Sequence, residues 1–303
     1  MSLVLSIFAQ DILPIFLVAA VGYVLAKRVA ADVKTLSTVA FNALSPCLVF
    51  DQLVTAQISR AEFGRMAAFC VLLVLAMGAV ARLAAIPLRL NRQTLSSFLL
   101  VVMFSNSGNY ALPVVLFAFG RDALAYASVY YVASAIVLYT LGVFVAASGH
   151  GNIGRALAGI VRVPAIYAVV AAALILSTHA SVPPAVMRPI TLLSDAAIPV
   201  MLLILGMQLE RAAMPERPAA VGVAVGLSLL VAPVIGVGLT MLLGLSGAAR
   251  QVAILSASMP AAVITTVLAL EFNLDPGFAT SAVFLSTVLS PFTLVLLIAY
   301  LQR

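Results

Sequence analysis

Apolar runs of about 20 residues recur from one end of this chain to the other, and they restrict its fold more than any other feature. A helix of that length crosses the hydrocarbon core of a bilayer, where only helices and closed barrels satisfy their own backbone polar groups. Of the 303 residues, 64% are hydrophobic and 9% are charged, whereas a soluble domain carries about 25% charged residues. The sequence therefore predicts an all-α polytopic membrane protein.

Polar breaks between the apolar runs predict ten transmembrane helices. Their expected ranges are 6–26, 35–55, 64–88, 93–119, 122–147, 161–178, 186–209, 218–244, 248–270 and 277–301. The first run carries Asp11, has no basic leader and is followed by further spans, so we interpret it as a helix rather than as a signal peptide. Cys47 and Cys70 both fall within predicted spans, which leaves neither a disulfide framework nor a metal quartet.

The longest polar break, residues 148–159, divides the chain into two groups of five spans, residues 1–150 and 151–303. An odd number of spans in each group requires the two halves to be inverted relative to each other. With the N-terminus outside, ten of the 16 Lys and Arg residues fall in inner loops and six fall in outer loops. The positive-inside rule therefore places both termini on the outer side of a cell (inner) membrane.

Prolines recur at matching positions of the two halves, each one turn after a hydrogen-bonding residue. The second and seventh spans contain NALSP (42–46) and DAAIP (195–199), and the fourth and ninth contain NYALP (109–113) and SASMP (256–260). Proline removes one helical hydrogen bond, so the freed carbonyl needs another partner. In the second and seventh spans, an ordinary kink and a functional break both remain open. In the fourth and ninth spans, the added Gly, Asn and Ser residues favour a true break.

Broken helices at matching positions of inverted halves point to the binding site of a transporter. We expect the fourth span to stop at Gly108–Asn109 and to restart near Pro113, and an equivalent half-helix to start around Pro260. Backbone N–H groups that lose their helical partners would present the positive ends of two half-helices near mid-membrane. Such a site suits a small anion, with asparagine amides as orienting donors.

The residues at these breaks resemble the auxin efflux carrier family, which includes plant PIN auxin exporters and bacterial malate and malonate permeases. The resemblance covers nearly the whole chain and is carried by NSGNYALP (106–113), VLYTLGVF (137–144), PAIYAVVAAAL (164–174), IPVMLLILGMQL (198–209) and ASMPAA (257–262). It implies the fold of the bile-acid sodium symporters, in which spans one, two, six and seven form a scaffold domain. The other six spans would form a transport domain that moves like an elevator.

The resemblance also implies a small organic anion as substrate, such as malate, malonate or an auxin-like acid, bound where the fourth and ninth spans cross. Carried over residue by residue, Asn109, Pro113 and Pro260 line this site and Tyr139 faces it. The neighbours of the two breaks, with Asn42 as the repeat partner of Asp195, complete the candidate site: Asn42, Asn106, Gly108, Tyr110, Ser256, Ser258 and Met259. Other expected partners are the lipid bilayer and a second copy of the chain through the scaffold, with no cofactor, metal or nucleic acid.

Charged residues within spans are rare, so each is a functional candidate by default. Asp195 lies one turn before Pro199, and it is either a proton-coupling or substrate-sensing carboxylate or a cap for the freed backbone. We expect Asp51 to be solvated at the outer end of its span. Sodium-coupled relatives with this fold carry an acidic residue beside the break in the ninth span. The stretch SASMPAAVITT (256–266) contains none, which argues against sodium coupling in this chain.

Other function classes fit the sequence less well. An intramembrane serine enzyme needs a base within hydrogen-bond reach, and the predicted spans contain neither His nor Lys. A channel normally takes its filter from symmetric loops or charged rings, and neither is visible. A proton- or sodium-coupled symporter of another solute and a ligand-binding sensor without transport remain as alternatives. The sequence therefore predicts a secondary transporter of a small organic anion rather than an enzyme.

Overall fold

The computed structural model describes residues 3–56, 58–147, 163–178, 180–210 and 217–302, and most of these residues are helical. The described part contains no β-strand, only one isolated antiparallel bridge between Ser105 and Ala261. Seven of the described helical segments are long and apolar enough to cross a membrane: Leu3–Val29, Val33–Thr55, Arg60–Ala84, Arg121–Ala146, Pro184–Leu209, Pro218–Leu242 and Pro276–Leu301. The chain is therefore an all-helical, multi-pass membrane protein, as predicted.

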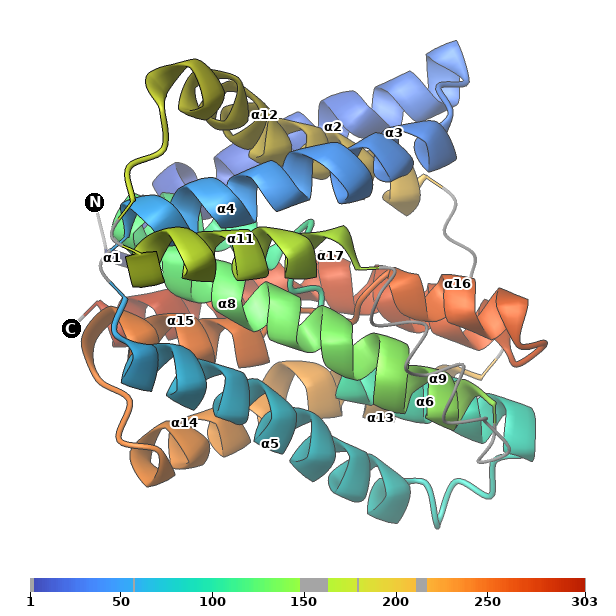
Figure 1. Ribbon diagram of the computed structural model, residues 1–303. Helices are drawn as coiled ribbons and strands as arrows, with labels where there is room; N and C mark the ends of the chain where they lie inside the picture. Colours follow the sequence, from blue (N-terminus) through green and yellow to red (C-terminus); the bar gives the residue numbers. More distant parts are fainter. Residues whose placement is uncertain (1–2, 57, 148–162, 179, 211–216, 303) are drawn as a thin grey trace.

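One group of helices forms a layer along one side of the bundle (Figure 1). It contains the segments α1 (Leu3–Ile7), η1 (Phe8–Ile12), α2 (Leu13–Val24), η2 (Leu25–Val29), α3 (Val33–Val39), η3 (Ala40–Leu44), α4 (Ser45–Thr55), α11 (Pro164–Thr178) and α12 (Pro184–Leu209), where η marks a π-helical turn. The long helix α12 packs against both α2 and α4, and α11 packs against α4. Helices from the first and second halves of the sequence thus share one layer.

Two glycines allow the closest contact in this layer. A Cβ atom at Gly206 of α12 would lie 1.6 Å from the carbonyl oxygen of Ala19, and one at Gly22 of α2 would lie 2.1 Å from that of Leu203. Any side chain at either position would therefore collide with the backbone of the opposing helix. Small residues that let two backbones approach are a usual basis of helix association in membranes. This contact explains the glycine of the GMQL stretch (206–209).

The remaining helices pack together on the other side of the bundle. They are α5 (Arg60–Ala84), α6 (Arg92–Met103), α7 (Ala111–Phe119), α8 (Arg121–Val137), η4 (Leu138–Gly142), α9 (Val143–Ala146), α13 (Pro218–Gly226), η5 (Leu227–Val231), α14 (Ala232–Leu242), α15 (Gly247–Ala257), α16 (Ile264–Glu271) and α17 (Pro276–Leu301). Helix α8 packs against α5, α7 and α15, and α17 packs against α6, α13 and α16. Helices from both halves of the sequence are thus interleaved here as well.

Side-chain caps start several of these helices where the sequence changes from polar to apolar. Ser59 and Glu62 form a reciprocal capping box at the start of α5, and Asn91 accepts a hydrogen bond from the Thr94 N–H at the start of α6. Asp275 caps α17 by accepting from the Phe278 N–H at 2.9 Å. Its other carboxylate oxygen accepts from the Thr94 hydroxyl at 2.7 Å, so this cap also joins the starts of α6 and α17.

The prolines of the second and seventh predicted spans lie within continuous helical segments. Helix α12 runs through Pro189 and Pro199, and α4 carries Pro46 in its first turn directly after the π-helical turn η3. Proline is tolerated in a first turn because the N–H that it lacks would have no helical partner there. Neither span is interrupted at its proline, in contrast to what a functional break would require.

Candidate functional site

Two segments between helices meet in the middle of the bundle. Helix α6 ends at Met103 and α7 begins at Ala111, while α15 ends at Ala257 and α16 begins at Ile264. The segments between them pair in antiparallel fashion: the Asn106 N–H donates to the Pro260 carbonyl at 2.7 Å, and the Ala262 N–H donates to the Phe104 carbonyl at 2.9 Å. We call residues 104–110 and 258–263 the crossing segments. They bring predicted site residues from opposite halves of the sequence into direct contact.

Hydroxyl groups replace some of the backbone hydrogen bonds that the crossing segments lose. The Ser105 hydroxyl donates to the Ser256 carbonyl at 3.0 Å, and the Ala261 N–H donates to the Ser286 hydroxyl oxygen of α17 at 3.1 Å. Irregular backbone inside a membrane protein is tolerated only where such partners or water satisfy it. Serines of the crossing segments and of α17 therefore stabilise the site.

Three polar side chains at the crossing segments have unused hydrogen-bonding capacity. Among the described residues, neither the side-chain nitrogen of Asn106 nor the hydroxyl of Ser256 has a partner, although both atoms are buried. The half-buried Asn109 side chain likewise makes no hydrogen bond within the part of the chain that the structure describes. Buried polar groups without partners are rare and costly. These three side chains therefore retain hydrogen-bonding groups that no protein group in the described structure uses.

The two half-helices present fewer free N–H groups than the sequence predicts. At the start of α7, the Ala111 N–H donates to the Asn106 carbonyl at 3.0 Å and the Leu112 N–H donates to the Gly108 carbonyl at 3.4 Å. In the second half, the helix begins at Ile264 rather than around Pro260, because Pro260 lies in the extended pairing segment. The asparagine and serine side chains, more than the helix ends, thus supply the free donors.

Several other predicted site residues pack closely around the crossing segments. Gly108 is buried, and a Cβ atom there would lie 3.0 Å from the ring of Tyr131. The Ser258 hydroxyl donates to the Ile254 carbonyl at 2.7 Å, and Pro113 and Met259 are buried. A cavity of about 10 Å³ lies beside Ser105 and Met259, which is about the size needed for one water molecule. The crossing segments are thus closed around their polar groups.

Three further predicted site residues have contacts with other parts of the protein. The Tyr110 ring is fully buried, packs edge-on against Phe16, and receives a hydrogen bond from the Ser290 hydroxyl at 2.9 Å. Its hydroxyl is therefore engaged by α17. The exposed Asn42 side chain donates to the Thr38 carbonyl of its own helix. The half-buried Tyr139 ring packs 6.4 Å from that of Phe41, centroid to centroid.

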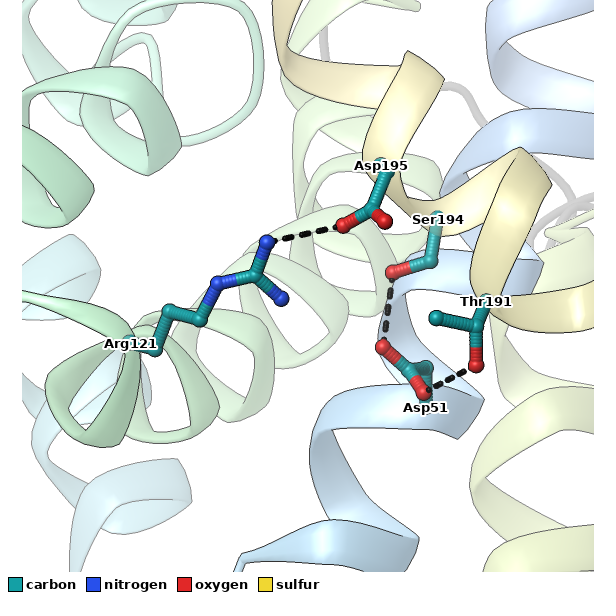
Figure 2. A network of polar contacts seen from close by, with 5 residues as sticks. All are labelled: Asp51, Arg121, Thr191, Ser194 and Asp195. Carbon is teal, nitrogen blue, oxygen red and sulfur yellow. Dashed lines mark hydrogen bonds and ion pairs between the residues drawn. The ribbon is translucent and has the colours of Figure 1, made fainter.

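The prediction that Asp51 is solvated is wrong. Its side chain is 4% exposed, and its two oxygens accept hydrogen bonds from Thr191 at 3.1 Å and Ser194 at 3.0 Å (Figure 2). Burial follows because α12 packs against α4 and brings both hydroxyls to this carboxylate. A signal was present in the sequence, since hydroxyl residues three positions apart share one face of a helix.

Asp195 forms an ion pair with Arg121, the first residue of α8, at 2.9 Å (Figure 2). Both side chains are largely exposed, with 50% of Asp195 and 67% of Arg121 accessible. The carboxylate thus bonds to a guanidinium rather than capping the backbone near Pro199. The pair lines an open cavity of about 210 Å³ whose walls come from α2, α4, α7, α8 and α12. We call this space the lateral cavity. The sequence did not point to it, because its walls come from five separate helices.

The chain is similar in sequence to known membrane transport proteins. Residues 7–298 match the profile of a family described as membrane transport protein. An uncharacterized transporter of Methanothermobacter thermautotrophicus is 27% identical over 286 residues, which cover 93% of this chain and 94% of that protein. One from Methanocaldococcus jannaschii is 25% identical over 206 residues, 67% of each chain. Auxin efflux carrier component 3a of rice (Oryza sativa subsp. japonica) is 29% identical over 120 residues, 39% of this chain and 19% of that carrier.

Proposed function

The chain belongs to the membrane transport protein family, which includes the auxin efflux carriers, and we propose that it is a secondary transporter of a small organic anion. It is a transport protein rather than an enzyme. The observation that carries the choice of substrate is the group of unused donors at the crossing segments, formed by the side chains of Asn106, Asn109 and Ser256. Amide and hydroxyl donors in a site of low dielectric constant bind a carboxylate more strongly than they would in water.

We propose that the chain spans the membrane ten times as two inverted groups of five. In this interpretation, α6 with α7 and α15 with α16 are each one interrupted span, and α11 is a short one of 15 residues. Together with the seven long segments, they make ten. The pairing of the two interruptions with each other supports this count, because interrupted spans of inverted halves meet at the substrate site in many transporters.

The packing supports a division into a scaffold and a moving domain. Helix α12 packs extensively against α2 and α4, and α11 packs against α4, so we assign these four helices to the scaffold. The crossing segments belong to the other group, so an elevator movement of that group would carry the bound anion past the scaffold. Close backbone packing at Gly22 and Gly206 suits a scaffold that stays rigid during this movement.

Within the site, we assign the Asn109 amide as the main donor to the substrate carboxylate, with the Asn106 side-chain nitrogen and the Ser256 hydroxyl beside it. Gly108, Pro113, Ser258, Met259 and Pro260 shape the backbone around these donors. The ion pair of Asp195 with Arg121 favours a substrate-sensing role for Asp195 over proton coupling, because this carboxylate is exposed and already paired.

Uptake into proteoliposomes tests the proposal. Labelled malate, malonate, lactate and indole-3-acetate are each offered with a pH gradient, a sodium gradient or neither. Saturable uptake of at least one acid supports an organic anion carrier, and stimulation by a pH gradient alone identifies proton coupling. Stimulation by sodium would contradict our interpretation of the ninth span, which lacks an acidic residue. If no acid is taken up under any condition, the substrate class is wrong.

A further inference from the structure

We propose that the lateral cavity is a second carboxylate site, in which the carboxylate of a small monocarboxylic acid replaces Asp195 as the partner of Arg121. This inference rests on the proposed transport of organic anions, because it assigns a further contact to the same substrate. The lateral cavity lies between the helices that we assign to the scaffold and the corner between α7 and α8. It is separate from the crossing segments, since none of residues 104–110 or 258–263 lines it.

The size and walls of the lateral cavity fit a small acid with an apolar body. Its volume of about 210 Å³ is below the range of about 300–1,000 Å³ that is typical of pockets for drug-sized ligands. Most of the wall is apolar, with contributions from Leu48 of α4, Leu116 and Phe117 of α7, Leu124 of α8 and Leu202 of α12. The hydrophobic effect would favour binding of a ligand there, because the apolar body of the ligand would be removed from water.

The polar part of the wall is concentrated around one cation. Arg121 is the only positively charged residue among those that line the lateral cavity. The other polar residues of the lining are Gln52, Ser194 and Asp195. A guanidinium offers five N–H donors in a planar fork that matches a carboxylate. In the described structure, the Arg121–Asp195 contact joins a single nitrogen, Nη2, to a single oxygen, Oδ1. The fork of Arg121 thus retains donors for a second carboxylate.

Exchange of Asp195 for a ligand carboxylate requires little disruption. Both members of the ion pair are at least half exposed, and exposed ion pairs contribute little to stability. When it is released, the Asp195 carboxylate can be solvated where it lies. A ligand that also fills the apolar part of the lateral cavity has an advantage that Asp195 lacks.

The charges around the lateral cavity select for one carboxylate rather than two. Two acidic side chains accompany Arg121: Asp195 lines the wall, and Asp51 accepts a hydrogen bond from the lining residue Ser194. A second carboxylate on the ligand would face these two acidic side chains, and no further cation lines the wall within the described structure. The site is therefore better suited to a monocarboxylate with an apolar body than to a dicarboxylate such as malonate.

Two substitutions should affect ligand binding in opposite directions if this is a binding site, but not if the ion pair only joins α8 and α12. If the ion pair only joins the helices, Arg121→Gln and Asp195→Asn both break it and affect the protein alike. If Asp195 competes with a ligand for Arg121, then Arg121→Gln removes the anchor, whereas Asp195→Asn frees it.

The test is equilibrium binding of labelled indole-3-acetate to the purified full-length protein in nanodiscs. All variants carry Asn109→Ala, so that the donor assigned to the crossing segments is removed. We expect Arg121→Gln to weaken binding at least tenfold and Asp195→Asn to strengthen it at least threefold. Arg188→Gln is the matched control, because Arg188 is an exposed arginine of α12 that does not line the lateral cavity, and it should leave affinity unchanged.

A second variant tests the volume of the lateral cavity without touching the ion pair. Leu116→Trp places a larger side chain in the wall and should abolish binding, and unlabelled malonate should compete at least tenfold less well than unlabelled indole-3-acetate. Weaker binding in both Arg121→Gln and Asp195→Asn, or no change in either, overturns the proposal. Uptake that depends on Asn109 but not on Arg121 would overturn this site alone, whereas absence of uptake of any acid would overturn the proposed function.

Discussion

The backbone N–H of Asn106 donates a hydrogen bond to the carbonyl oxygen of Pro260 at 2.7 Å, although 154 positions separate the two residues in the sequence (260 minus 106). This bond joins the segment after α6 to the segment after α15. Each segment thereby satisfies part of the other's backbone, which neither could do alone within a membrane. The geometry of the proposed substrate site thus depends on both halves of the chain being folded together.

Substitution of Asn109 tests the proposed substrate site directly. Asn109→Ala removes an amide with no hydrogen-bond partner in the described structure, so folding should be little affected. A hydrogen bond to a charged group contributes about 1.5–3 kcal/mol, which corresponds to a loss of substrate affinity of about 10- to 150-fold. Initial uptake rates measured over a range of substrate concentrations should show this loss.

The matched control for that measurement is Gln93→Ala. Gln93 carries an exposed amide in the first turn of α6, so its loss should leave uptake within about twofold of wild type, as expected of a surface substitution. Full activity of Asn109→Ala would refute the substrate site at the crossing segments.

Loss of the Ser286 hydroxyl should destabilise the crossing segments. Ser286→Ala leaves the buried Ala261 N–H without its acceptor, which costs about 1–3 kcal/mol. The midpoint of thermal unfolding in detergent should therefore fall. Ser177→Ala is the control, because the Ser177 hydroxyl is exposed and bonds to its own helix. Equal stability of both variants would show that water or another group satisfies Ala261 just as well.

A methyl group at Gly206 should disrupt the contact between α2 and α12. Gly206→Ala places Cβ 1.6 Å from the Ala19 carbonyl oxygen, and overpacking of this kind costs about 1–3 kcal/mol or more. At Gly222, a Cβ atom has nothing within 4 Å. Gly222→Ala should therefore be neutral or stabilising, by up to about 1 kcal/mol, because alanine is the better helix former. Unfolding midpoints of the two variants, measured in parallel, provide the comparison, and a Gly206→Ala protein as stable as wild type would contradict the close approach.

Removal of the Asp51 carboxylate should lower the stability of the protein, whereas removal of a solvated carboxylate would have little effect. Asp51→Ala deprives Thr191 and Ser194 of their acceptor, at a cost of about 1–3 kcal/mol. Asp51→Asn keeps one acceptor oxygen and should cost less. The exposed Asp122 in the first turn of α8 is the reference, since Asp122→Ala forfeits only a favourable helix-dipole contribution of about 0.3–1 kcal/mol. If the midpoint of thermal unfolding of Asp51→Ala is as high as that of Asp122→Ala, then Asp51 is solvated after all.

Features that depend only on residues close together in the sequence could be predicted from the sequence. Apolar runs located the seven long helices because a bilayer requires a minimum length of apolar helix. Helix-breaking residues act on their own turn, so the stretches around Asn109 and Pro260 were recognisable as special positions. The donor chemistry of Asn106, Asn109 and Ser256 is likewise a property of the residue types.

Which side chains meet across the bundle was decided by tertiary packing alone. Asp51 is buried because α12 presents hydroxyls from 140 and 143 positions away, and Tyr110 bonds to Ser290, 180 positions away. Arg121 and Asp195, 74 positions apart, meet only because α8 and α12 face each other across the lateral cavity. Local sequence determines that a segment is helical and apolar. The face that it turns toward a partner depends on the shapes of all its neighbours, including backbone contacts as close as those of Gly22 and Gly206.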